Sequence, residues 1–374
     1  MAWVEKRLGD VCRLINGRAY KKHEMLPVGP YPLLRVGNFF TNRSWYYSDM
    51  ELHPDKYCDD GDLLYAWSAS FGPRIWDGGK VIYHYHIWKI EIDKELVDKN
   101  YLYYLLDWDK ELIKSEQGAG TTMVHVTKGS MEKRLLPFPC LDEQKRIVAI
   151  LDQTFADLEQ VRAKTEQNLK NARELFDSYL QQVFSQRGEG WEDSTLGAIS
   201  ENLDNKRIPI TKKDRIEGEY PYYGASGVVD YVDGYLFDER LLLVSEDGAN
   251  LLARTYPIAF SAVGRYWVNN HAHVLRFNDL YTQKFIEYYL NSISLVPYVS
   301  GMAQPKLNQR SLNRIPVPKV THEIAIEVVS KLEFLEKQIN QVEKVYRSKI
   351  DKLDELKKSI LQKAFSGELT AKTE

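Results

Sequence analysis

At 374 residues, 44% of them hydrophobic, the chain is long enough for two or three ordinary globular domains. A formal net charge of −3 argues against a protein that holds nucleic acid by bulk charge alone, although local basic patches stay open. Three scattered cysteines without a CxxC pair argue against a disulfide framework or a thiolate zinc site. The sequence has no apolar run of ~20 residues and its first residues have no apolar signal core, so we expect a cytoplasmic protein without a membrane span.

The first 140 residues have the pattern of a mixed α+β domain. Strand-like residues fill 81-VIYHYHIWKI-90, and a helix is expected near residues 99–115. After 137-PFP-139 no proline or glycine occurs before Gly188. This predicts one long helix over 141–187, with Asp142 as its N-cap.

Apolar residues in this helix recur at alternating steps of three and four. The seam runs from Val148 to Val183 and has two polar breaks, Arg162 and Thr165. Such spacing predicts a coiled coil, and about 44 helical residues would span roughly 66 Å.

The second half of the chain predicts the same elements again. Strand-like residues fill 241-LLLVS-245, and a helix is expected near 282–293. A second long helix is predicted over 319–366, with Thr321 as its candidate cap and a similar apolar seam.

The two halves also share sequence motifs, and the matched segments lie roughly 180–190 residues apart. The matched pairs are 3-WVEKRLG-9 with 191-WEDSTLG-197, 134-RLLPFP-139 with 313-NRIPVP-318, and 175-LFDSYLQQVFS-185 with 356-LKKSILQKAFS-366. We therefore predict an α+β fold in which two similar globular domains are joined by two long antiparallel coiled-coil helices as a pseudo-twofold internal repeat. The predicted domains are 1–140 and 188–318, the helices are 141–187 and 319–366, and a tail covers 367–374.

The stretch 271-HAHVLRF-277 raises the question of a metal site. Residues two apart in a strand share a face, so His271 and His273 have a spacing that metal ligands use. The first half contains 84-HYHIWKI-90, which we pair with it as a shared scaffold strand. That pairing favours packing over metal binding, so no metal is expected, while the residues just upstream, which include Asn269 and Asn270 in the second half, differ between the two stretches.

The motifs together resemble the specificity subunit of type I restriction–modification systems. The resemblance rests on 137-PFPCLDEQKRIVAILD-152, its counterpart at 316–332, the segment 361-LQKAFSGELT-370 and the loop 117–139, and it covers nearly the whole chain. It implies that each globular domain is a target recognition domain that reads one half of a bipartite, asymmetric DNA sequence. It also implies that the long helices form the spacer and dock two methyltransferase subunits.

The same resemblance implies that catalysis belongs to partners. S-adenosylmethionine would belong to the methyltransferase subunits, and ATP and Mg²⁺ to the restriction subunits of the larger complex. The sequence agrees, because it has no Asn-Pro-Pro-Tyr motif, no glycine-rich cofactor loop and no G-x4-G-K-[ST] phosphate loop. We expect a chain that is not an enzyme and has no cofactor of its own.

Candidate DNA contacts are Arg, Lys, Asn, Gln, Ser and Thr side chains on loops, and the glycines of the first-domain loops would permit close backbone approach. In the first domain they are Asn16, Arg18, Lys21, Lys22, Arg35, Asn38, Ser68, Ser70, Arg74, Thr121, Thr122 and Lys128. In the second they are Lys206, Arg207, Lys212, Lys213, Ser226, Asn250, Arg254, Asn269, Asn270, Gln304, Lys306 and Gln309. Glu246 and Asp247 would repel phosphate, but a carboxylate can accept a hydrogen bond from a cytosine amino group.

Four other readings stay open at this point. They are a nuclease centred on the acidic turn 59-DDGD-62, a metalloenzyme built on the His-x-His stretches, a specificity module of another DNA-methylation or phage-defence system, and a coiled-coil adaptor with no nucleic-acid role.

Overall fold

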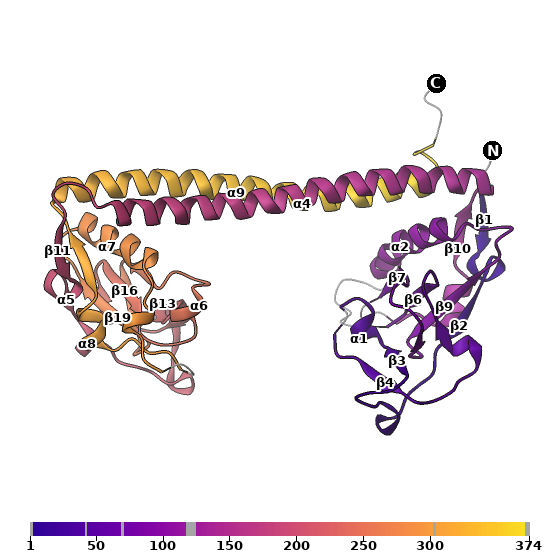
Figure 1. The fold of residues 1–374 in the computed structure, drawn as a ribbon, viewed down its shortest axis with the longest axis horizontal. Coiled ribbons are helices and arrows are strands. Elements are labelled where there is room, and N and C mark those ends of the chain that lie inside the picture. Colours follow the sequence, from indigo (N-terminus) through magenta and orange to yellow (C-terminus); the bar gives the residue numbers. More distant parts are fainter. Residues whose placement is uncertain (1–2, 42, 69–70, 117–124, 302–303, 371–374) are drawn as a thin grey trace. The chain divides into compact units, whose positions relative to one another are not determined.

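The computed structural model describes residues 3–41, 43–68, 71–116, 125–301 and 304–370. The chain divides into two compact units (Figure 1). Unit 1 contains Met1–Thr165 and Ser348–Glu374, and unit 2 contains Glu166–Arg347. The two long helices are therefore not separate domains, because each contributes one part to each unit.

The strands of the two halves of the chain follow one another in the same order, while the short helices Val36–Phe39 and Asn250–Ala253 have no counterpart among the described residues of the other half. The first set is β1 (Val4–Arg7), a 3-10 turn (Leu8–Asp10), β2 (Cys12–Asn16), β3 (Tyr31–Leu34), α1 (Val36–Phe39), β4 (Tyr46–Ser48), β5 (Tyr57–Cys58), β6 (Leu63–Ala66), β7 (Gly72–Ile75), β8 (Val81–Tyr83), β9 (Ile87–Ile92), α2 (Lys99–Glu116), α3 (Lys128–Glu132), β10 (Leu135–Phe138) and α4 (Leu141–Gln186). The second set is β11 (Glu192–Thr195), α5 (Leu196–Ile199), β12 (Glu201–Asn202), β13 (Glu217–Gly224), β14 (Gly227–Val232), β15 (Phe237–Asp238), β16 (Leu241–Ser245), α6 (Asn250–Ala253), β17 (Ala259–Ala262), β18 (Arg265–Val268), β19 (Ala272–Arg276), α7 (Leu280–Ser292), α8 (Gln309–Asn313), β20 (Pro316–Lys319) and α9 (His322–Phe365).

Both units have the same sheets in the same strand order. The order β2-β9-β6-β7 in unit 1 is matched by β12-β19-β16-β17 in unit 2, and β4-β3-β8-β5 is matched by β14-β13-β18-β15. The second sheet of each unit is mixed, with β3 parallel to β8 and β13 parallel to β18. A two-stranded ladder, β1-β10 or β11-β20, leads into each long helix. The predicted α+β internal repeat is confirmed as a repeat of topology.

The shared Trp-x4-Leu-Gly motif has a packing reason. A Cβ atom on Gly9 would lie 3.2 Å from Glu132, and one on Gly197 would lie 2.9 Å from the Cβ of Asn313. The leucine before each glycine is fully buried. Each motif therefore brings a short turn close against α3 or α8, where a Cβ atom in place of the glycine would crowd the neighbouring residue.

The long helices form the predicted antiparallel pair. In unit 1, Lys357 of α9 lies over the ring of Phe155 on α4, and Arg162 further along α4 pairs with Asp354 earlier on α9. The polar break at Thr165 is accommodated because its hydroxyl donates to the Val161 carbonyl at 2.7 Å. In the described part of the chain, no helix is both long and apolar enough to cross a membrane.

The starts of the two long helices and the apolar seam of α9 agree with the predictions only in part. Thr321 is confirmed as the α9 cap, since its hydroxyl accepts from the Ile324 N–H. Asp142 is not the α4 cap, because the helix already begins at Leu141. Its carboxylate lies in the first turn instead, where negative charge is favourable. The α9 seam is also imperfect, as Val342 and Leu356 are 39% and 46% exposed.

An aromatic contact fixes the last turn of each long helix on a globular part. Phe365 of α9 packs on α2, with ring centroids 5.5 Å from Tyr101 and 5.4 Å from Trp108. Phe184 of α4 packs on α7, at 5.3 Å from both Phe285 and Tyr289. The two sites repeat one another, and they explain the matched phenylalanines in the sequence motifs.

Replacing Phe365 by Ala should lower the free energy of unfolding by about 3–5 kcal/mol, because a large buried ring is lost from the unit 1 core. Phe334→Ala is the matched control on the same helix, since Phe334 is 66% exposed. That change should stay within about 0.5 kcal/mol. Denaturant unfolding of the full chain measures both, and equal losses would contradict the assignment.

Candidate nucleic-acid interface

Each globular part has a three-residue turn at the same place between two strands, and this turn forms part of the candidate site. Residues 84–86 connect β8 to β9, and residues 269–271 connect β18 to β19. The expectation of a continuous strand over 81–90 was therefore wrong at its centre, where His84, Tyr85 and His86 turn the chain.

Backbone hydrogen bonds show which residues of the two turns correspond. Trp67 donates its N–H to the His86 carbonyl at 3.0 Å, and Glu246 donates to the His271 carbonyl at 2.9 Å. His86 thus corresponds to His271. In the adjoining ladders Tyr65 faces Trp88 and Val244 faces His273. His273 therefore takes the place of Trp88.

The sequence pairing of HYHIWKI with HAHVLRF was wrong by two residues. Side chains alternate with a period of two along a strand, so a shift of two preserves the inward and outward pattern. Hydrophobic alternation could not reveal the slip. The structural counterpart of 84-HYH-86 is 269-NNH-271, and His271 and His273 do not lie together on one strand face, since β19 begins at Ala272.

The first residue of each turn is structural. The Asn269 side-chain oxygen accepts from the His271 N–H at 2.8 Å, and the equivalent His84 Nδ1 accepts from the His86 N–H at 3.5 Å. Asn269 is 6% exposed, so the prediction that it reads bases is wrong. Asn270, the next residue, is exposed.

A third segment joins the turn in both units. The Leu307 N–H donates to the Glu246 carbonyl at 2.7 Å, and Val126 donates to the Trp67 carbonyl at 3.4 Å. Isolated bridges pair Asp247 with Lys306 and Ser68 with His125. We call the common framework of these backbone bonds the readout frame. It comprises residues 67–68, 84–86 and 125–126 in unit 1, and 246–247, 269–271 and 306–307 in unit 2.

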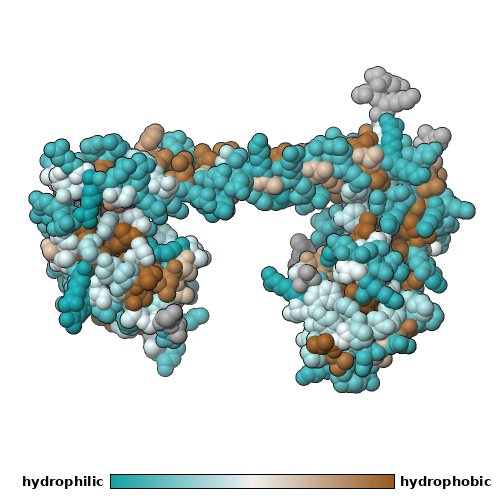
Figure 2. Space-filling model, in the orientation of Figure 1, coloured by the Kyte–Doolittle hydropathy of each residue, from teal (hydrophilic) through white to brown (hydrophobic). Residues whose placement is uncertain are grey.

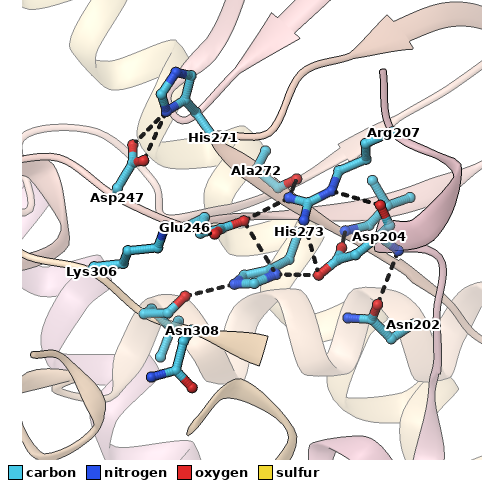
Figure 3. Close-up of polar contacts among 12 residues, drawn as sticks. Asn202, Asp204, Arg207, Glu246, Asp247, His271, Ala272, His273, Lys306 and Asn308 are labelled. Carbon is cyan, nitrogen blue, oxygen red and sulfur yellow. Dashed lines mark hydrogen bonds and ion pairs between the residues drawn. The ribbon is translucent and has the colours of Figure 1, made fainter. Parts of the chain in front are cut away.

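Beneath the unit 2 frame lies a buried ionic network (Figure 3). His273 is 1% exposed; its Nδ1 lies 2.6 Å from Asp204 and its Nε2 lies 2.7 Å from the Leu307 carbonyl. Both ring nitrogens therefore lie within hydrogen-bond distance of an oxygen atom. Arg207 donates to Glu246 at 2.7 Å and to the Ala272 carbonyl at 2.7 Å.

The network balances its own charges. Burial alone would raise the pKa of Asp204, but the hydrogen bond and charge of His273, the Val274 N–H and Arg207 together lower it, so the carboxylate stays ionised. Lys306 pairs with Glu246 at 3.2 Å. These ion pairs and hydrogen bonds fix the side chains beneath the readout frame and so hold the frame in place.

Asp204, Glu246 and His273 are also grouped closely enough to hold a metal ion, the one such group among the described residues. Two side-chain cations already neutralise these carboxylates. A metal ion would have to displace the Arg207 guanidinium and the hydrogen bond between His273 and Asp204. The geometry therefore favours an ion-pair network, and the absence of a metal site stays a prediction.

Unit 1 has an aromatic stack where unit 2 has this ion pair. Trp67 and Trp88 stack at 5.8 Å with an interplanar angle of 21°, and they occupy the places of Glu246 and His273. His86 and His125 pack against Trp67, with ring centroids 4.8 and 5.7 Å away. The same backbone frame thus rests on two different chemistries.

Most of the other predicted contacts fall into three groups. Exposed or partly exposed residues that remain suitable are Asn16, Lys21, Lys22, Arg35, Lys128, Lys206, Lys212, Lys213, Ser226, Asn270, Gln304, Lys306 and Gln309. Residues whose side chains hold their own loops are Arg18, Arg74, Arg207, Asn250 and Arg254. Ser70, Thr121 and Thr122 lie outside the described residues.

Two further candidates are buried and are corrected with Asn269. Asn38 is 2% exposed and spans its own loop, accepting from the Arg35 N–H and donating to the Leu33 carbonyl. Ser68 is 6% exposed. The Asn38 side chain is therefore used by the backbone of its own loop, as buried polar groups usually are.

Sequence reasoning also missed some accessible frame residues. Tyr85 is 38% exposed, and the side chain of His271 is 52% exposed. Neither tyrosine nor histidine is among the side-chain types, Arg, Lys, Asn, Gln, Ser and Thr, that defined the candidate DNA contacts. The only indication in the sequence was that both belong to the paired His-x-His stretches, and that pairing was out of register.

Replacing His273 by Ala should destabilise unit 2 by about 3–5 kcal/mol, because buried carboxylates lose their partner. His271→Ala is the matched change two residues away on an accessible side chain, and it should cost under about 1 kcal/mol. Thermal or denaturant unfolding of the two variants compares them. Similar losses would argue against the buried network as the anchor of the frame.

Unit 1 should lose stability in mild acid. Burial, with the charges of His86 and Arg35, lowers the pKa of His84 from 6.5 to about 4. The unfolded chain therefore takes up this proton first, and the stability present above pH 6.5 is lost as the pH falls towards 4. His84→Asn keeps the turn's acceptor, as Asn269 does in unit 2, and should remove part of this loss.

The measurement is the unfolding midpoint at pH 7.5 and pH 5 for the wild type, His84→Asn and the exposed control His23→Asn. The control should follow the wild type. An acid loss that is unchanged in His84→Asn would rule out this histidine as its source.

Comparison with known proteins agrees with this architecture. The family described as the type I restriction modification DNA specificity domain matches residues 2–170 and 188–351. The EcoBI specificity subunit of Escherichia coli is 25% identical over 99% of this chain and 87% of that protein. A putative specificity subunit of Haemophilus influenzae, S.HindORF215P, is 32% identical over 45% of this chain, but the match spans only 41% of that relative's length.

Solved structures show the same fold. A chain from a type I R-M system, in a study of its complex assembly and conformational transition, superposes with a TM-score of 0.77 at 19% identity, over 98% of both chains. The HsdS subunit of Thermoanaerobacter tengcongensis gives 0.56 at 20% identity, over 98% of this chain and 97% of that one. With both repeats matched by the family and the topology doubled in the same way, the chain belongs to the DNA specificity subunits of type I restriction–modification systems, which recognise DNA and do not catalyse its modification.

Proposed function

We propose that each globular part reads one half of a bipartite, asymmetric DNA target. The observation that supports this most is the readout frame, which has the same backbone bonds in both units but different side chains. Ser68 and His125 occupy the places of Asp247 and Lys306. Two frames of one geometry with different donors and acceptors suit two different half-sites.

The long helices would act as the spacer between half-sites and as docking sites for two methyltransferase subunits. Hydrophilic residues cover most of the visible surface of α4 and α9, with apolar patches between them (Figure 2). Leu175, Phe334 and Val345 are 59%, 66% and 64% exposed. Apolar side chains left uncovered on a helix pair suit burial against partner helices.

Catalysis would then lie entirely in the partners. S-adenosylmethionine would be bound by the methyltransferase subunits, which would act on a base taken out of the duplex. ATP and Mg²⁺ would be used by restriction subunits in the full complex. This chain would supply the choice of sequence and the distance between half-sites.

Partners would also supply much of the charge that neutralises DNA phosphates. The chain has a net charge of −3, and several of its arginines are paired internally, as Arg207 is with Glu246 and Arg276 with Glu239. We therefore expect the isolated chain to bind duplex DNA only in the non-specific range, with a Kd of about 10⁻⁶–10⁻⁴ M at physiological salt. The assembled complex should reach about 10⁻⁸ M or better on its own target.

Methylation mapping by single-molecule sequencing, in cells that carry this chain and its methyltransferase partner, tests the proposal. The expected result is a split motif with one methylated adenine in each half and a fixed gap. Cells with the methyltransferase alone provide the control. A continuous motif, or tight specific binding by the isolated chain, would contradict it.

A further inference from the structure

We propose that Asp247, Asn270, His271 and Lys306 form the base-reading group of unit 2, in which Asp247 accepts a hydrogen bond from the exocyclic amino group of a base. The amino group is that of cytosine N4 or adenine N6. This inference rests on the proposed function and assigns the residues that would determine one half-site.

The four residues occupy positions that both units share. The four residues lie on the three segments of the readout frame, and their counterparts in unit 1 are Ser68, Tyr85, His86 and His125. Three of the four pairs differ in chemical type, while the backbone bonds that hold them are the same. Positions that change side chain on an unchanged backbone are those expected to set specificity.

Asp247 and its neighbour Glu246 differ in exposure and in how many hydrogen bonds their carboxylates can still accept. Glu246 is 9% exposed, and its two oxygens are taken by Arg207 at 2.7 Å and Lys306 at 3.2 Å. Asp247 has a side chain that is 31% exposed. Its carboxylate faces His271, whose Nδ1 lies 2.8 Å from Oδ2 and 2.9 Å from Oδ1 (Figure 3).

The contact with His271 leaves Asp247 with acceptor capacity. A carboxylate offers about four lone-pair sites, and one ring N–H satisfies only part of them. The histidine also fixes the direction of the carboxylate, since both oxygens lie against the same nitrogen. Asp247 is thus a positioned acceptor at the rim of the frame.

The negative charge of Asp247 restricts which groups of DNA it can contact. A carboxylate repels the phosphate backbone, so on a DNA-facing surface it must meet a hydrogen-bond donor. In the major groove the bases present only two donors, cytosine N4 and adenine N6. Asn270 and Lys306 beside it supply donors for acceptors on adjoining bases, as amide and ammonium groups do for adenine and guanine.

The test uses Asp247→Asn in the full chain, assembled with its methyltransferase partner and mapped by single-molecule sequencing. Asn keeps the size but replaces one acceptor by a donor. We expect one position of one half-site to relax or change, with methylation of the original sequence falling roughly 10- to 100-fold. The half-site read by unit 1 should stay as in the wild type.

Asp233→Asn is the matched control, because it makes the same chemical change on an exposed residue after β14, at the open end of the β13–β14 hairpin. It should leave both half-sites unchanged. A change at a cytosine position identifies N4 as the partner, and a change at an adenine position identifies N6; either supports the assignment.

Two outcomes overturn it. One is a wild-type split motif that Asp247→Asn leaves unaltered, and the other is a uniform loss of methylation in a variant whose unfolding midpoint has also fallen. A wild-type complex without any split motif would instead refute the proposed function. The failures of the two proposals are therefore distinguishable.

Discussion

Two phenylalanines at the ends of two helices determine how this chain is organised. Phe365 closes the core of unit 1 against α2, and Phe184 closes that of unit 2 against α7. Each ring belongs to a helix that starts from the other unit. Neither unit can complete its core without the last turn of a helix from elsewhere in the chain, so the repeat is joined by packing as well as by sequence.

The two units support the same readout frame with different side chains. The segments of the readout frame must be held in place by side chains packed beside them. In unit 1 the stacked rings of Trp67 and Trp88 do this. Unit 2 instead uses Glu246 and His273 inside an ionic network. Removing one partner of a buried ion pair leaves an uncompensated charge, whereas a pair of stacked rings holds no charge to compensate. The same backbone has therefore been kept over different interiors.

Much of this architecture could be predicted from the sequence because it depends on local periodicity. Long seams, proline-marked helix starts and repeated motifs predicted α4, α9 and the doubled topology. The site was harder. A slip of two residues between HYHIWKI and HAHVLRF preserves strand alternation, so only the hydrogen bonds of β9 and β19 reveal it. Likewise, nothing in the sequence distinguishes the buried Asn269 from the exposed Asn270.

The division of the chain has a consequence for its synthesis. Unit 2 is one continuous segment, Glu166–Arg347, whereas unit 1 needs residues from Ser348 onward to complete a core that begins at Leu8. Domains usually fold in the order in which they leave the ribosome. Here the earlier unit must wait, with part of its apolar surface uncovered, until the later unit has been made.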